Sequence, residues 1–185
     1  MSVIRPAFLV GIGALIPGMA SAHRLDEYLQ ATTIDLARNH IALHLHLVPG
    51  VDVAKSVIQE LDTNHDGTFS LFEERSYVSQ IIHRLSVFLN GEQQPITLNT
   101  ATFPPLKDIQ GGTGVVDLQL TIITVPQIGF NHLIYINRGS GPETAWLVNC
   151  LLPSDPTFHI LQQKRSPNQS DYQLDFQILP SKIHN

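Results

Sequence analysis

Apolar and polar residues alternate through most of this chain, and this alternation restricts the fold to sheets with one buried face. In the segment His40–Val48, isoleucine and leucine occupy every second position. Successive side chains of a β-strand point to opposite sides, so these residues should share one face. The preceding segment, Leu25–Leu36, is expected to pair with this strand through a turn near Arg38 and Asn39.

Further alternating segments follow, separated by turns rich in Gly, Pro, Asn and Ser. The pair Asn90-Gly91 is typical of a two-residue hairpin and is expected to join strands at Ser86–Leu89 and Glu92–Leu98. Additional strands are predicted at Val115–Val125, His132–Asn137, Thr144–Leu151, Phe158–Gln163 and Tyr172–Leu179. Short strands at such spacing favour a mainly β (α+β) fold organised as an antiparallel β-sandwich.

One stretch, at about residues 50–85, departs from the alternation. Apolar residues recur there at helical spacing on both sides of a polar loop. They are Val53, Val57, Ile58 and Leu61 before the loop, and Tyr77, Ile81, Ile82 and Leu85 after it. The sequence therefore predicts a helix–loop–helix inserted between two strands of the β domain.

The loop between these helices has the pattern of an EF-hand. Calcium prefers about seven oxygen ligands, and a twelve-residue loop supplies them from positions 1, 3, 5, 7, 9 and 12, with glycine at the sharp turn of position 6. Gly67 holds position 6, and position 7 contributes its backbone carbonyl. The predicted ligands are Asp62, Asn64, Asp66, Thr68, Ser70 and Glu73. This pattern predicts one Ca²⁺ ion as the cofactor.

The role of this ion follows less directly from the sequence. We find no second EF-hand pattern, so the loop has to pack against the sheets or against a partner. Extracellular modules of this kind bind calcium at roughly 10⁻⁴–10⁻³ M. We therefore expect a structural ion, or one that orders a partner-binding surface, more than a fast switch.

The first 22 residues read as a signal peptide. Arg5 precedes the apolar segment Ala7–Ile16, and small residues lead to a cleavage site after Ala22. The apolar segment is about half the ~20 residues that span a bilayer, and no later segment could span one. We expect a periplasmic or secreted protein with one β-rich domain at 23–180 and a loose tail at 181–185.

Composition excludes some classes of function. The chain has 185 residues, of which 43% are hydrophobic and 15% charged, and a formal net charge of −5. A nucleic-acid partner would require a basic face, so none is expected. The single cysteine, Cys150, cannot form an internal disulfide and is expected to be packed and inert.

The histidines of the chain support an alternative function. Nine are present, and His44 and His46 lie two apart on a predicted strand, so their rings should project from one face about 6.6 Å apart along it. After cleavage, His23 would add an imidazole beside a free amino group. These three residues could bind nickel, copper or zinc in an accessory protein that handles transition metals. His65 and His83 are expected at the surface.

No enzyme is predicted. Serine, histidine and aspartate occur, but no Gly-x-Ser-x-Gly, His-Glu-x-x-His or phosphate-binding glycine loop frames them. The run Gly111–Gly114 precedes a predicted strand, whereas a phosphate loop precedes a helix. It therefore reads as a turn.

Four features of the chain occur together: the opening segment His23–Ala31, the Pro49-Gly50 that ends a strand, the EF-hand loop and the Phe103-Pro104 pair. In these features the chain resembles a family of bacterial exported EF-hand domain proteins of poorly defined function. Similar regions occur as extracytoplasmic parts of membrane proteins that resemble hydrogenase/urease accessory permeases. The resemblance implies an envelope partner and a link to nickel or cobalt.

Overall fold

The computed structural model describes residues 26–139 and 143–180, and these are mainly β. The predicted signal peptide with its cleavage site, His23 and the predicted tail at 181–185 lie outside the described residues. The strands are β1 (Tyr28–Leu36), β2 (His40–Pro49), β3 (Leu85–Leu89), β4 (Glu92–Gln94), β5 (Thr97–Thr102), β6 (Val116–Ile123), β7 (Gly129–Asn137), β8 (Thr144–Cys150), β9 (Phe158–Arg165) and β10 (Asp171–Ile178). The helices are α1 (Val51–Leu61), α2 (Leu71–His83) and α3 (Leu106–Gln110). The predicted mainly β fold with helices is therefore confirmed at this level.

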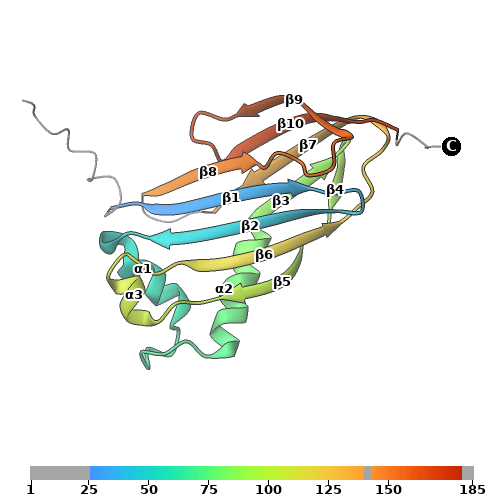
Figure 1. Cartoon of the computed structure of the whole chain (residues 1–185). Coiled ribbons are helices and arrows are strands. Elements are labelled where there is room, and N and C mark those ends of the chain that lie inside the picture. Colours follow the sequence, from blue (N-terminus) through green and yellow to red (C-terminus); the bar gives the residue numbers. More distant parts are fainter. Residues whose placement is uncertain (1–25, 140–142, 181–185) are drawn as a thin grey trace, which may run out of the picture.

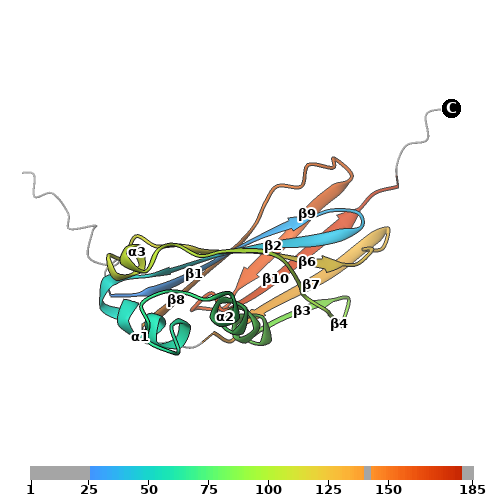
Figure 2. The ribbon, with the colours of Figure 1, turned by 90° about the horizontal axis from the view of Figure 1, so that it is seen from below.

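The strands form two five-stranded sheets. Their orders are β5-β6-β2-β1-β8 in the first sheet and β4-β3-β7-β10-β9 in the second. Figures 1 and 2 show the sheets as two layers, with α1 and α3 at one end and α2 nearer the middle of the molecule. Buried residues from both sheets and from the helices belong to one hydrophobic cluster.

The alternation in the sequence predicts which faces are buried. On β2, every second residue from Ile41 to Leu47 is fully buried, whereas His44 is half-buried and His46 exposed. On β10, the alternate residues from Tyr172 to Ile178 are buried in the same way. Removing such side chains from water contributes about 1.5–3 kcal/mol each, so these two strands supply much of the core.

Strand pairing differs from the expectation in two places. β1 pairs with β8 in parallel, so the first sheet is not purely antiparallel. The segment expected as one strand at Glu92–Leu98 divides at Pro95: β4 ends in the second sheet and β5 begins in the first. Proline cannot donate a backbone hydrogen bond, which explains the break. The turn at Asn90-Gly91 was predicted correctly, with positive φ at both residues.

Along the chain, the two predicted helices follow β2 of the first sheet and precede β3 of the second. α1 buries Val53, Val57 and Leu61, and α2 buries Tyr77 and Ile81. Leu85, expected on the second helix, instead begins β3, because the helix ends at the Arg84 cap. The short α3 was not predicted. Among the described residues, no helix has the length and apolarity that crossing a membrane requires.

Aromatic contacts fix α2 against the rest of the fold. The hydroxyl groups of Tyr77 on α2 and Tyr28 on β1 are 2.6 Å apart, in a buried hydrogen bond. The ring of Tyr77 also meets Phe103 edge-on, with centroids 6.3 Å apart. Burial and the neighbouring hydroxyl raise the pKa of Tyr28 above its ordinary value, so the pair stays neutral. The middle of α2 is therefore held against β1 and against Phe103.

Candidate metal-binding loop

The predicted loop runs from the last turn of α1 to the first turn of α2. Asp62 caps the C-terminus of α1, and Ser70 caps the N-terminus of α2. Ser70 and Glu73 form a reciprocal capping box, in which each side chain accepts a hydrogen bond from the backbone N–H of the other. Serine followed three residues later by glutamate is a sequence signature of a helix start, so the same residues that define the loop also begin the helix.

Two residues turn the loop back on itself. Gly67 has φ +81°, and nothing lies within 4 Å of the position that a Cβ would take, so conformation rather than space favours glycine. His65 has φ 60°, which was not predicted and is uncommon for a residue with a side chain. His65 is exposed, as expected for a residue that is not a ligand.

Hydrogen bonds gather the first half of the loop around two carboxylates. Asp62 accepts from the backbone N–H of Asp66 at 3.2 Å and from that of Gly67 at 3.0 Å. Asp66 accepts from both the backbone N–H and the hydroxyl of Thr68, at 2.8 and 2.7 Å. Asn64 donates to the other oxygen of Asp66 at 2.9 Å. Four of the predicted ligand residues are thus joined directly.

Glu73 connects the second half of the loop to the first. One of its oxygens accepts from the backbone N–H and the hydroxyl of Ser70, at 3.0 and 2.7 Å. The other accepts from the backbone N–H groups of Thr63 and Asn64, at 2.8 and 3.2 Å. The hydroxyl of Thr63 adds a contact at 3.0 Å. Thr63 was not among the predicted site residues, and nothing in the sequence distinguishes its position from other exposed threonines.

Burial separates the ends of the loop from its middle. Asp62 and Glu73 are only 4% and 3% exposed, whereas Asn64, Asp66 and Thr68 are exposed. Leu61, directly before the loop, is fully buried, and Phe69 packs partly against the core. The core therefore holds both ends of the loop.

The loop concentrates negative charge. The hydroxyl and backbone N–H of Ser70 lower the pKa of Glu73 to about 2, and hydrogen bonds from Thr68 lower the pKa of Asp66. Within the described residues, no lysine or arginine pairs with Asp62, Asp66 or Glu73. Three carboxylates thus share one short loop, no lysine or arginine of the described residues pairs with them, and two of them are buried.

The three carboxylates of the loop do not gather as a metal centre in this structure. In the described part of the chain, no three His, Cys, Asp or Glu side chains gather in the manner of a metal centre. The carboxylates instead accept hydrogen bonds from the N–H and O–H groups of the loop. The donor chemistry, with three carboxylates, one amide oxygen, the backbone carbonyl of Thr68 and the hydroxyl of Ser70, fits a hard cation.

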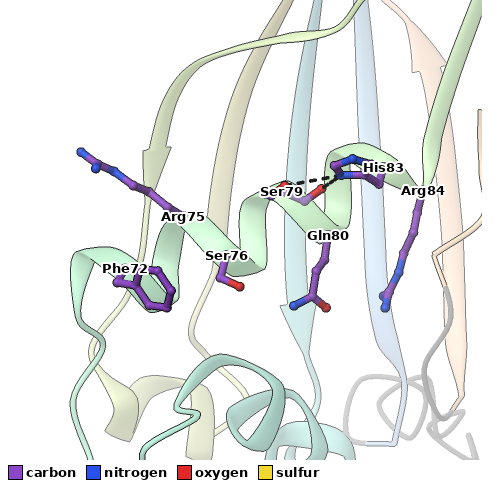
Figure 3. A pocket seen from close by; sticks show the side chains of 7 residues that line it. All are labelled: Phe72, Arg75, Ser76, Ser79, Gln80, His83 and Arg84. Carbon is purple, nitrogen blue, oxygen red and sulfur yellow. Dashed lines mark hydrogen bonds between the residues drawn. The ribbon is translucent and has the colours of Figure 1, made fainter.

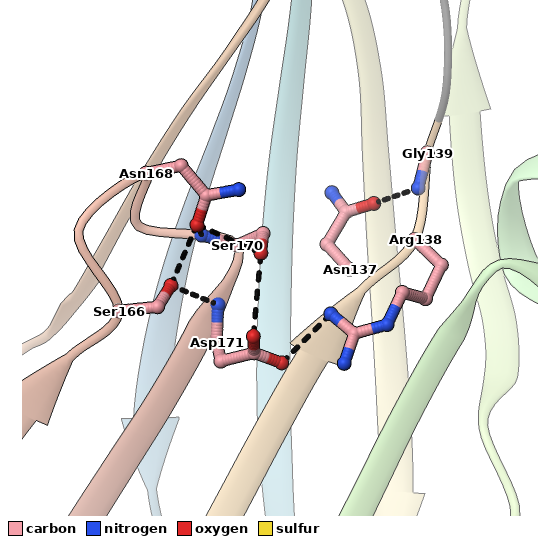
Figure 4. Close-up of polar contacts among 7 residues, drawn as sticks. All are labelled: Asn137, Arg138, Gly139, Ser166, Asn168, Ser170 and Asp171. Atoms are coloured by element: carbon pink, nitrogen blue, oxygen red, sulfur yellow. Dashed lines mark hydrogen bonds and ion pairs between the residues drawn. The ribbon is translucent and has the colours of Figure 1, made fainter.

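A second polar turn, between β9 and β10, shows how this protein neutralises a carboxylate without an ion. Ser166, Asn168 and Ser170 hydrogen-bond among themselves, and Ser166 accepts from the backbone N–H of Asp171 (Figure 4). The Asp171 carboxylate then pairs with Arg138 at 2.8 Å. The EF-hand-like loop has no equivalent of this arginine among the described residues.

Of the three histidines of the alternative site, His44 and His46 belong to the described residues and His23 does not. His44 and His46 project from the outer face of β2, as predicted. The ring of His46 lies 3.0 Å from the carboxylate of Asp117 on β6. His83 is exposed on α2, where its ring nitrogen lies 2.6 Å from the Ser79 carbonyl.

Cys150 is half-buried at the end of β8, and its thiol lies 3.3 Å from the carbonyl of Leu151. Burial, with a smaller contribution from Asp35, raises the pKa of Cys150 to about 12. The thiolate that would act as nucleophile or metal ligand is therefore scarce at neutral pH.

Comparison with known proteins adds no relative. No family model matches the chain, and neither the curated proteins nor the solved structures contain a match. The interpretation of the loop therefore depends on its residues and on its geometry.

Proposed function

We propose that this protein is an exported calcium-binding protein with a single EF-hand. Asp62, Asn64, Asp66, Thr68, Ser70 and Glu73 would hold one Ca²⁺ ion. The observation that carries the proposal is the pair of buried carboxylates, Asp62 and Glu73, at the two ends of a loop where the described residues offer no cationic partner. Buried charges are normally paired or coordinate a metal.

The chain's residues would orient the ligands in distinct ways. Gly67 and His65 turn the backbone, and the side chains of Asp62 and Asn64 both accept from the backbone N–H of Asp66. The capping box fixes Glu73 at the start of α2. When bound, the ion would supply the positive charge that the loop lacks.

The expected energetic contribution favours a structural role. If ambient calcium exceeds Kd about tenfold, the ion adds about 1.4 kcal/mol to the stability of the folded state. In this proposal, the two sheets act as a sandwich that carries the helix–loop–helix, and the ion orders the surface around α2 for an envelope partner. The setting is periplasmic or secreted, and the role is not enzymatic.

A transition-metal accessory role is the second candidate. The observation that favours it is the shared outer face of His44 and His46 on β2. His46 already has a carboxylate neighbour in Asp117, which is a usual arrangement for a polar sheet surface. The alternative therefore needs a ligand from outside the described residues, such as His23.

Thermal unfolding of the purified protein distinguishes the calcium-binding function from the transition-metal function. We expect EDTA-treated protein to gain stability from millimolar calcium, and this gain to disappear in Asp62→Ala. A response to micromolar nickel, cobalt or copper that disappears in the double variant His44→Ala/His46→Ala would favour the alternative. Absence of any response to millimolar calcium would refute the calcium proposal.

A further inference from the structure

The end of the two sheets opposite α1 and α3 is formed by four connections and by the end of β10 (Figures 1 and 2). The connections join β1 to β2, β3 to β4, β6 to β7 and β8 to β9. Strand register places them together, because β7 begins beside the end of β10 and β2 begins beside the end of β6. We refer to residues 37–39, 90–91, 123–130, 151–157 and 179–180 as the distal end.

Large apolar side chains are exposed at the distal end. Four of them lie within the eight residues 123–130, and two come from the connection after β8 and from the end of β10. Their exposed fractions range from 40% to 90%, and they are Ile123, Val125, Ile128, Phe130, Leu152 and Leu179. Gly129 pairs with Ile178, so the next residues, Ile128 and Leu179, lie side by side. Single exposed apolar residues are common, whereas a group of them marks an interaction surface.

A buried amide fixes the connection between β6 and β7. The side chain of Asn131 is fully buried, donates to the carbonyl of Gln127 at 2.7 Å and accepts from the backbone N–H of Gln127 at 3.0 Å. Asn90, from the connection between β3 and β4, donates to the same side-chain oxygen at 3.1 Å. The exposed apolar side chains therefore stand on an ordered connection, so that a partner would bind without a large cost in loop ordering.

The distal end carries no net charge. Arg38 and Asp155 are the only charged residues in its five segments, and the guanidinium of Arg38 meets the carboxylate of Asp155 at 2.7 Å. These two charges neutralise one another. The whole chain has a formal net charge of −5, so the excess negative charge lies elsewhere on the molecule.

Exposed apolar residues at the start of α2 have different surroundings. Leu71 is 71% exposed, and Phe72 is 80% exposed on the outward side of the helix (Figure 3). Glu73 and Glu74 follow directly, and Asp66 lies in the preceding loop. Two copies of the chain that met here would bring like charges together, which opposes association. The distal end offers apolar side chains without this repulsion.

A second copy of the chain fits the distal end better than an anionic membrane does. In a twofold-symmetric contact the same surface patch of each copy meets the other, so a charged patch repels itself and a neutral apolar patch does not. Attraction to anionic lipid requires free cationic side chains, but Arg38 is already paired with Asp155. The distal end contains roughly twenty residues, close to the number that each side of a standard protein interface uses.

We infer that two copies of this chain associate through their distal ends, with the connection between β6 and β7 at the centre of the contact. Association removes the exposed apolar side chains of this connection from water, which is the driving force. The candidate metal-binding loop, between α1 and α2, lies away from the distal end (Figure 1). The contact is therefore independent of calcium, and the inference does not rest on the proposed function.

Sedimentation equilibrium of the purified protein at a series of concentrations tests this inference. We expect a monomer–dimer equilibrium that is the same in calcium and in EDTA, and that added salt does not weaken, because no opposite charges attract across the contact. Val125→Asp should raise the dissociation constant of the dimer at least tenfold, since it sets like charges against each other. Phe72→Asp adds the same charge at an equally exposed apolar position outside the contact, and should leave the constant unchanged. Thermal unfolding confirms that both variants are folded.

Four results would overturn the inference: a monomer at every concentration up to about 1 mM, a dimer that Val125→Asp leaves intact, equal weakening by Phe72→Asp, or association that requires calcium. Vesicles of phosphatidylcholine that bind a monomeric protein, and fail to bind Val125→Asp, would assign the distal end to a membrane instead. Calorimetric titration of the same sample with calcium tests the proposed function separately, because its failure leaves the association unchanged.

Discussion

Two turns of this protein have the same local structure and different electrostatic surroundings. Asp66 accepts hydrogen bonds from the backbone N–H and the hydroxyl of Thr68, at 2.8 and 2.7 Å. Asp155, between β8 and β9, accepts the same two bonds from Thr157, at 2.9 and 2.6 Å. The second oxygen of Asp155 then meets the guanidinium of Arg38 at 2.7 Å.

The difference shows which carboxylates this fold neutralises by itself. At Asp155 the cation is a side chain from the turn between β1 and β2, so the pair joins distant parts of the chain. At Asp66 the second oxygen meets only the amide of Asn64, and two further carboxylates lie in the same loop. The turn at Asp66 thus has the hydrogen bonds of the turn at Asp155 but no cationic side chain beside it. We propose that calcium supplies this positive charge.

The largest expected effect concerns Glu73. Glu73→Gln preserves the size of the side chain and an acceptor for the capping box, but it removes the charge and one ligand oxygen. Even residues behind metal ligands change metal affinity by roughly 10- to 100-fold, so calcium affinity should fall by at least that range. Calcium titration followed by thermal unfolding measures this. An unchanged calcium response would remove Glu73 from the site.

Asp66→Asn should have a smaller effect on calcium and almost none without it. The asparagine oxygen can still accept from Thr68, so the turn should persist. Hydrogen bonds from Thr68 and Asn64 outweigh the repulsion from Glu73 and lower the pKa of Asp66, so the charged group contributes a little to stability at neutral pH. We expect weaker calcium binding and a slightly lower unfolding midpoint in EDTA. A marked loss of stability in EDTA would show that Asp66 is chiefly a structural residue.

Asp155→Asn provides the matched control at the other turn. Hydrogen bonds from Thr157, with Arg38, lower the pKa of Asp155 below its ordinary value. Its contribution to stability is therefore present above that ordinary value and is lost as pH falls through the lowered one. The variant should have a slightly lower midpoint at neutral pH, and its difference from the parent should vanish in acid. Unfolding scans from pH 7 to pH 2 measure this. A change in the calcium response of Asp155→Asn would contradict the proposed difference between the two turns.

The smallest effect is expected for His65→Gly. His65 has φ 60°, a conformation that glycine adopts without steric cost, and its side chain is exposed and not a predicted ligand. Calcium affinity should stay within about twofold, because no ligand oxygen is removed. Calorimetric titration beside the parent protein checks this, with His65→Ala as a control that retains a Cβ. A large loss of affinity would indicate that the imidazole takes part.

Much of the fold was predictable because alternation reports burial directly. The inner faces of β2 and β10 follow from every second residue, and the helix positions follow from Val53, Val57, Tyr77 and Ile81. Pairing between distant strands leaves no such periodic signal, so the parallel contact of β1 with β8 was missed. The change of sheet after Gln94 depends on one proline within an otherwise continuous strand pattern.

The position of the loop between two helices was predictable from the sequence, and the contacts within the loop were not. The spacing of Asp62, Asn64, Asp66 and Glu73 marks the loop, and the structure places Asp62 and Glu73 at the ends of two helices. Burial of these carboxylates, the positive φ of His65 and the hydrogen bonds of Thr63 arise from tertiary packing and loop geometry. Periodicity carries no information about them.

Calorimetric titration of the calcium-free protein with calcium, with Asp62→Ala measured alongside, tests the central claim most directly. The account predicts one binding site per chain, with Kd at or below about 10⁻³ M, and loss of that heat in the variant. No binding heat up to millimolar calcium, or equal heat from parent and variant, would contradict it.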